Sequence, residues 1–144
     1  MPSVSAKELL TFILEIKWRF GTHGLNGHCC GNLSEAEYRA LCLAAGQLQC
    51  SMQEIAKGLG FTKSGASRLI DRLEKKGYTK RIRSLDDGRV CCVEVTPTGK
   101  KLINSLEGEN EARIKRILSN IDPAMQQVIS ASLQSLVQAI KKET

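Results

Sequence analysis

Lysine and arginine side chains gather between residues 61 and 101 of this 144-residue chain. The segment holds eleven basic and five acidic residues, a net charge of +6. The whole chain has 21 basic and 15 acidic residues, also +6, so the residues outside the segment sum to zero. Side chains of this type donate hydrogen bonds to phosphates and base edges, and their concentration favours a polyanionic partner.

The order of elements across this segment predicts where the basic side chains lie. Thr62 is expected to cap a helix that ends near Gly77, and a short strand follows it. A turn at residues 85–89 then leads into a second strand over residues 90–95. A helix followed by a basic-tipped hairpin is typical of winged DNA-binding units, with the helix in the major groove and the hairpin on the backbone or minor groove.

The phase of this helix separates its core side from its outer side. Ala66, Leu69, Ile70 and Leu73 recur at helical spacing and are expected to face the core. The outward side chains are candidate DNA contacts, because base edges are read near the start of such a helix. These candidates are Lys63, Ser64, Ser67, Arg68 and Arg72. The alternatives are a solvated helix surface, or local pairing of the two arginines with Asp71 or Glu74.

The hairpin supplies a second group of candidates. Lys80, Arg81 and Arg83 suit phosphate contacts better than base contacts. Arg89 is expected to enter the narrow, electronegative minor groove, with Asp87 orienting its guanidinium. The alternative for Arg89 is a bond to Asp87 that only stiffens the turn.

Two capping boxes organise the segment before this helix. Ser34–Glu37 and Ser51–Glu54 each predict the start of a helix, and Gly60 predicts the end of the second one. Two short helices joined by a glycine-containing turn form a helix-turn-helix. The sequence therefore predicts a mainly α fold with a small β wing: a single domain over residues 1–144, with a winged helix-turn-helix DNA-binding lobe at residues 34–99.

The terminal segments, residues 1–20 and 100–144, are predicted to form dimerisation helices. Their apolar stripes are broader than a small winged domain can cover, so a homodimer is expected. Two-fold partners read two half-sites about 34–36 Å apart on double-stranded DNA. Gly108 is expected to weaken the long helix that follows Pro97 and to mark a bend.

Composition narrows the class of protein. Hydrophobic residues make up 42% and charged residues 25%, typical of a soluble globular domain. Aromatic residues are only 4%, too few for a single-strand-binding surface built on stacked bases. Charged residues within the first helix, such as Lys7 and Glu15, argue against a signal peptide or a membrane span. We therefore expect a cytoplasmic protein with no membrane partner.

Six cysteines occur without the Cys-x-x-Cys spacing of a structural zinc site, and no disulfide framework is expected in this compartment. Cys42 is expected in the core, whereas Cys91 and Cys92 should point to opposite faces of a strand. The cluster His28, Cys29 and Cys30 has the donors for soft-metal binding or a thiol switch. The alternative is a loop without a sensing role, so no metal or other cofactor is assigned.

Motifs along most of the chain resemble the MarR family of bacterial transcription regulators. The family's opening before the second helix corresponds to Leu33–Tyr38, and the first element of its helix-turn-helix to Ser51–Ala56. Its recognition-helix ending corresponds to Arg68–Gly77, and its wing signature to Asp87–Arg89 and Val95–Gly99. The resemblance implies a homodimer joined through the first and last helices, with the recognition helix in the major groove and the wing arginine in the minor groove.

The leading functional hypothesis is a sequence-specific, DNA-binding transcriptional repressor released by a small-molecule, metal or redox effector. The alternative is a winged-helix adaptor whose basic face binds an acidic protein. An enzyme is not expected, because the sequence contains no nucleophile elbow, phosphate-binding glycine loop or evident carboxylate pair.

Overall fold

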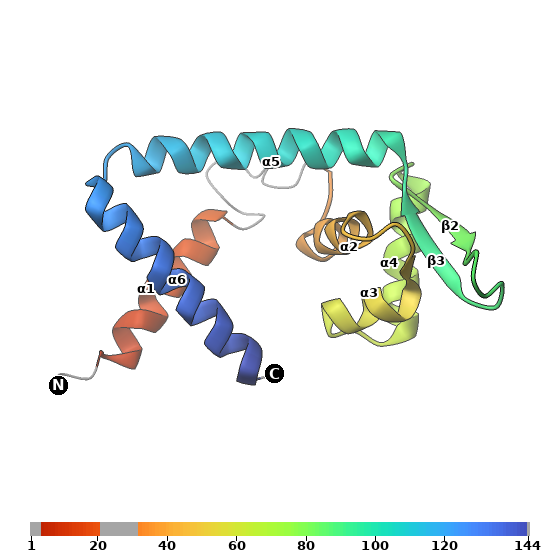
Figure 1. The fold of residues 1–144 in the computed structure, drawn as a ribbon, viewed down its shortest axis with the longest axis horizontal. Helices are drawn as coiled ribbons and strands as arrows, with labels where there is room; N and C mark the ends of the chain where they lie inside the picture. Colours follow the sequence, from red (N-terminus) through yellow and green to blue (C-terminus); the bar gives the residue numbers. More distant parts are fainter. Residues whose placement is uncertain (1–3, 21–31, 144) are drawn as a thin grey trace. The chain divides into compact units, whose positions relative to one another are not determined.

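The computed structural model describes residues 4–20 and 32–143, which form helices and one small antiparallel sheet (Figure 1). The chain divides into two compact units, Met1–Leu106 and Glu107–Thr144. The expected mainly α fold with a β wing is confirmed. Each unit is described below by itself.

The first unit contains the winged helix-turn-helix. Its elements are helices α1 (Ala6–Phe20), α2 (Glu35–Ala45), α3 (Met52–Leu59) and α4 (Lys63–Lys75), strands β1 (Cys50–Ser51), β2 (Thr79–Arg83) and β3 (Cys91–Val95), and the first turns of α5 (Pro97–Leu118). Both predicted capping boxes are present at the starts of α2 and α3. Gly60 ends α3 with a left-handed φ of 68°, as expected, and Thr62 Oγ1 accepts from the Gly65 amide at 3.1 Å to cap α4.

The sheet has the strand order β1-β3-β2, with both pairs antiparallel. Strand β1 was not predicted from the sequence. It pairs Cys50 with Val93 and Ser51 with Cys92, so it forms the third strand of the wing sheet. Two residues are too few to show the alternating pattern by which a strand is recognised.

A continuous core holds α2, α3, α4 and the sheet together. The largest fully buried side chains come from each of these elements: Leu41, Cys50, Ile55, Ile70, Leu73 and Val93. All four predicted core positions of α4 are buried. Because the inner side of α4 is buried in this core, its opposite side faces away from the core.

Thr96 and Gly99 join the end of the wing to the start of α5. The Thr96 hydroxyl donates to the Gly77 carbonyl at 2.6 Å and accepts from the Gly99 amide at 3.1 Å. A Cβ at Gly99 would lie 2.3 Å from the carbonyl oxygen of Tyr78, so only glycine fits there. This packing explains why threonine occupies position 96 and glycine position 99.

The second unit consists of the remainder of α5 and of α6 (Pro123–Glu143). Asp122 Oδ2 accepts from the Ala124 amide at 3.1 Å, which caps α6 as expected. Helix α5 continues through Gly108 as one uninterrupted helix, and the bend expected at this glycine stays a prediction. None of the helices in the described part of the chain is long and apolar enough to span a membrane.

Candidate nucleic-acid interface

Helix α4 presents a polar outer side. Lys63, Ser64, Arg68 and Arg72 are exposed, and Ser67 is half-buried beside them. The spacing of these positions by three and four residues places them on one side of the helix, opposite the buried side chains. The five helix candidates identified from the sequence therefore share one accessible surface.

Several basic side chains of this surface lack an acidic partner. Within residues 4–20 and 32–143, no ion pair involves Lys63, Arg68, Arg72 or Arg89. The local pairing of Arg68 and Arg72 with Asp71 or Glu74 is therefore not observed. By contrast, Lys76 and Lys80 are paired with Glu37 and Glu94. The uncompensated charges are the ones available to an external polyanion.

Arg81 differs from its basic neighbours because its half-buried side chain is hydrogen-bonded to α4. Its Nη1 lies 2.7 Å from Asp71 Oδ1 and 3.0 Å from Glu74 Oε2. Burial opposes the charge of Arg81, but the hydrogen bond to Asp71 and the attraction of Glu74 outweigh it and raise its pKa. The expected phosphate contact is therefore not available to Arg81, which instead ties strand β2 to α4.

The tip of the wing is a hydrogen-bonded turn. Ser84 Oγ accepts from the amides of Asp86 and Asp87 at 3.3 and 3.4 Å. Asp87 Oδ1 accepts from the backbone amide of Arg89 at 3.0 Å, and no contact between this carboxylate and the Arg89 guanidinium is present in the described residues. The expected orientation of the guanidinium by Asp87 is thus replaced by a contact that shapes the turn.

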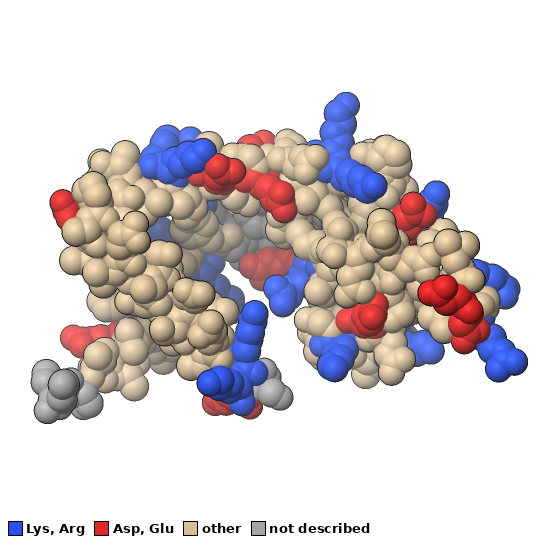
Figure 2. Space-filling model, in the orientation of Figure 1, with Lys and Arg blue, Asp and Glu red and all other residues tan. Residues whose placement is uncertain are grey.

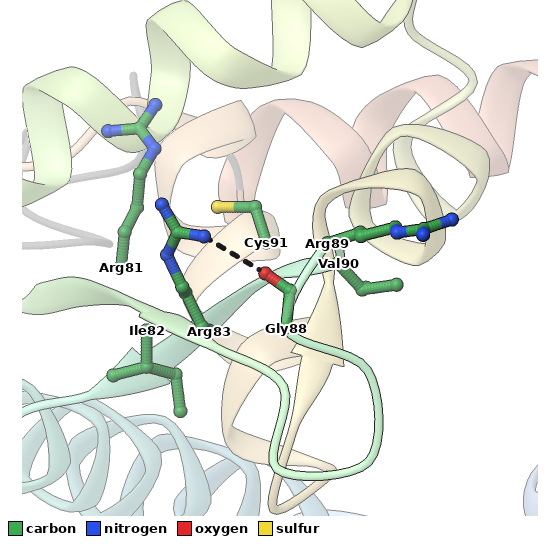
Figure 3. Close-up of a pocket in the computed structure, with 7 residues that line it drawn as sticks. All are labelled: Arg81, Ile82, Arg83, Gly88, Arg89, Val90 and Cys91. Carbon is green, nitrogen blue, oxygen red and sulfur yellow. Dashed lines mark hydrogen bonds between the residues drawn. The ribbon is translucent and has the colours of Figure 1, made fainter.

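Three arginines line an open pocket of about 380 Å³ on the hairpin. Figure 3 shows Arg81, Arg83 and Cys91 projecting from one face of the hairpin and Ile82 from the other. Arg83 Nη1 donates to the Gly88 carbonyl at 3.2 Å, whereas Arg89 extends away from this group. Arg83 therefore braces the turn, and Arg89 remains extended.

Charged side chains are visible at the hairpin end of the first unit. Figure 2 shows lysine and arginine side chains there, with acidic side chains between them. The acidic residues of the turn, Asp86 and Asp87, accept backbone amides or lie exposed within it. The basic side chains extend furthest into solvent in this view.

The described cysteines are free thiols in different environments. Cys91 is exposed and Cys92 is buried, as the strand pattern predicted, while Cys42 is only partly buried. Burial and the nearby Glu54 raise the pKa of Cys50 to about 11. Burial, with smaller contributions from Cys91 and Glu54, also raises the pKa of Cys92. Neither buried thiol is suited to reaction at neutral pH.

The proposed sensing cluster of His28, Cys29 and Cys30 lies outside the described residues. Among residues 4–20 and 32–143, no group of three or more histidine, cysteine or acidic side chains is arranged to hold a metal ion.

Comparison with known proteins identifies the family. The MarR family model matches residues 33–91. The HTH-type transcriptional regulator PapX of Escherichia coli is 31% identical over 119 residues, covering 79% of this chain and 68% of PapX. The uncharacterized HTH-type transcriptional regulator YfiV of Bacillus subtilis is 29% identical over 110 residues, covering 76% of this chain and 69% of YfiV. The chain belongs to the MarR family of helix-turn-helix transcriptional regulators, and the expectation of a non-enzymatic protein is confirmed.

Solved structures support the same fold. Streptococcus pneumoniae FabT in complex with DNA gives a TM-score of 0.79 at 20% identity, with 96% of each chain covered. A MarR family protein from Bacillus stearothermophilus gives a TM-score of 0.78 at 18% identity, covering 94% of this chain and 92% of that one. These similarities confirm the winged helix-turn-helix with N- and C-terminal helices.

Two features of the interface were missed in the sequence. The attachment of Arg81 to α4 joins residues 67, 71, 74 and 81, and the Lys76–Glu37 pair joins residues 39 apart. Asp71 and Glu74 on α4 were a partial indication of this attachment, because acidic side chains on a DNA-binding helix repel phosphate unless a cation neutralises them. No pattern in the neighbouring sequence indicates that Arg81 is the cation that pairs with them.

Proposed function

We propose that this chain binds specific sites on double-stranded DNA through α4 and the wing and acts as a transcriptional repressor. The observation that carries the proposal is the set of basic side chains without acidic partners: Lys63, Arg68, Arg72 and Arg89. Helix α4 enters the major groove, Arg89 enters the minor groove, and Arg83 supports the duplex beside it. Such a regulator acts in the cytoplasm, where the chromosome is accessible.

The arrangement of charges favours DNA over an acidic protein surface. The basic side chains occupy both a helix with a polar outer side and an adjacent hairpin, the two elements that a winged unit places in neighbouring grooves. The structure of FabT in complex with DNA supports this proposal, because the fold of that protein is shared by this chain.

A footprinting experiment on the DNA upstream of the protein's own gene tests this function. We expect protected sites in two halves about one helical turn apart, with affinity that falls steeply as salt is raised. Unrelated DNA of equal length is the control. Equal, unlocalised binding to both DNAs, or no binding to either, would contradict the proposal.

We also propose that the chain is a homodimer through the apolar sides of α1 and α6. No residue of either helix is buried in the single chain. Large apolar side chains are exposed on both: Leu9, Phe12, Ile13, Ile16, Met125, Val128, Leu133, Val137 and Ile140. Apolar surface of this extent is unfavourable in water and marks an interaction site.

Two lysine substitutions on α6 test the proposed dimer interface. Val137→Lys places a charge in the proposed interface, whereas Gln138→Lys places it opposite the centre of the apolar side of the helix. In analytical ultracentrifugation we expect the wild-type chain and Gln138→Lys to sediment as dimers and Val137→Lys to dissociate. A wild-type monomer, or equal dimerisation of both variants, would contradict the proposed interface.

We propose finally that an effector lowers DNA affinity by favouring a conformation that binds DNA less well. The effector is a small molecule, or it is a metal or an oxidant that acts at His28, Cys29 and Cys30. DNA affinity measured with zinc, with a chelator and with peroxide separates them. Loss of a zinc or peroxide response in Cys29→Ser and Cys30→Ser would assign sensing to this cluster, and an unchanged response would exclude it.

A further inference from the structure

The hydroxyl of Ser67 receives a hydrogen bond from within the protein. Nη2 of Arg81 lies 3.0 Å from Ser67 Oγ and 3.1 Å from the Ser67 backbone oxygen. A guanidinium has donors only, so Ser67 Oγ is the acceptor in this contact. The proton of the hydroxyl is therefore not used by Arg81.

That proton also has no acceptor elsewhere in the described ranges 4–20 and 32–143. A serine within a helix often donates to the carbonyl four residues earlier, which here belongs to Lys63. No such bond is formed, and Ser67 donates to no other described group. Ser67 is half-buried, and its hydroxyl retains one donor for an external partner.

Arg81 is fixed in the position from which it donates. Its Nη1 contacts Asp71 Oδ1 at 2.7 Å and Glu74 Oε2 at 3.0 Å, and its backbone amide donates to Glu74 Oε1 at 2.7 Å. Glu74 therefore holds both the main chain and the side chain of Arg81. The two carboxylates neutralise the guanidinium and hold it beside Ser67, so it is not available to a phosphate.

Ser67 lies on the part of α4 that the proposed function places in the major groove. It is one helical turn beyond Lys63 and Ser64 and adjacent to Arg68, all of them exposed. Major-groove edges differ in where they present acceptors and donors. A hydroxyl whose donor is unused, while one of its acceptor sites is occupied, can therefore favour bases that present an acceptor.

We propose that Arg81, by occupying an acceptor site of Ser67, favours its role as hydrogen-bond donor, so that Ser67 selects a base with an acceptor in the major groove. Such acceptors are N7 and O6 of guanine, N7 of adenine and O4 of thymine, whereas cytosine presents an amino donor. Ser67 is then a specificity-determining residue, and Arg81 is a positioning residue that acts through it. The inference rests on the proposed DNA-binding function.

Selection from a random duplex library with the full-length protein tests the inference. We expect Ser67→Ala to lose the base preference at one position of each half-site by roughly threefold to tenfold, the range for one hydrogen bond. Preferences at the other positions should remain. Ser105→Ala, which removes an exposed serine from α5, is the control and should select the wild-type site.

Arg81→Lys tests the positioning role. It keeps the charge but removes the planar fork, so Ser67 can turn its proton to the Lys63 carbonyl. We expect the same base position to lose its preference, with no further loss at that position in the Arg81→Lys, Ser67→Ala double variant. If the selected base is a purine read at N7, replacing it with its 7-deaza analogue should weaken the wild-type protein and not Ser67→Ala.

Three outcomes would overturn the inference. Ser67→Ala could keep every base preference of the wild type, or it could weaken binding to all sequences equally, which indicates a phosphate contact. A wild-type preference for cytosine on the contacted strand at the position affected by Ser67→Ala would also contradict a donor role. If the wild-type protein selects no sequence, the proposed function fails together with the inference. Selection of a site unaffected by Ser67→Ala fails the inference alone.

Discussion

Nζ of Lys76 lies 2.6 Å from Oε2 of Glu37, a carboxylate that is almost completely buried. Lys76 follows the last residue of α4, and Glu37 is in the first turn of α2. The same ammonium donates to the Asn32 carbonyl at 2.8 Å. This pair attaches the C-terminal end of the recognition helix to the start of α2, so it helps to set the angle at which α4 is presented.

Removal of this ammonium should destabilise the fold. We expect Lys76→Met to lower the free energy of unfolding by about 1–3 kcal/mol, because it leaves the buried Glu37 carboxylate without its cation. Urea denaturation followed by circular dichroism measures the change. The neighbouring Lys75→Met is the control: Lys75 is exposed and has no ion pair among the described residues, so a change within about 0.5 kcal/mol is expected. Equal effects of the two variants would contradict the role of the pair.

Two glycines of α5 should respond to alanine in opposite directions. At Gly99 the added methyl group would lie 2.3 Å from the Tyr78 oxygen and 2.8 Å from Val95 Cγ1, so we expect Gly99→Ala to cost about 1–3 kcal/mol. At Gly108 the methyl group meets no atom within 4 Å, and alanine should stabilise the helix by about 0.5–1 kcal/mol. Thermal denaturation of the two variants and the wild type measures both changes in stability. Stabilisation by Gly99→Ala would show that the close approach is absent.

The thiols should differ in their rates of alkylation. A pKa of about 11 at Cys50, against a usual 9.0, leaves about 1% thiolate at pH 9, where an ordinary thiol is half ionised. We therefore expect iodoacetamide to label exposed Cys91 in the folded protein and to label Cys50 only on unfolding or as the pH approaches 11. Peptide mapping by mass spectrometry measures both rates. Labelling of Cys50 at the rate of Cys91 at pH 8 would contradict its burial.

The raised pKa of Cys50 also has a consequence for stability. Between pH 9 and 11 the unfolded thiol loses its proton while the folded thiol keeps it, so the free energy of unfolding falls as the pH rises. Below pH 9 both states are protonated and this contribution is constant. The decline should be smaller in Cys50→Ala than in the wild type over the same pH range.

Local signals in the sequence were sufficient for most of the fold. The capping boxes at Ser34 and Ser51 and the glycine at position 60 act within one helical turn, and the structure places all three as expected. The apolar phase of α4 correctly identified its buried side. These features depend on neighbouring residues, which is why one sequence reveals them.

Long-range contacts could not be predicted in the same way. Strand β1 exists because residues 50 and 51 pair with β3, more than 40 residues away. Arg81 was expected to contact phosphate because its strand neighbours are basic, yet three residues of α4 hold its side chain. The partner of a charged side chain depends on tertiary packing, so the sequence showed the excess charge but not which cations remain available.

The salt dependence of DNA affinity shows whether the cations without acidic partners in the described residues bind the duplex. Affinity for the selected site should be measured between 50 and 300 mM salt for the wild type, Arg68→Ala, Arg89→Ala and the control Lys80→Ala, whose lysine is paired with Glu94. We expect weaker binding and a slope reduced by about one per phosphate contact removed in the two arginine variants, with little change in the control. A wild-type affinity independent of salt, or equal effects of all three substitutions, would contradict it.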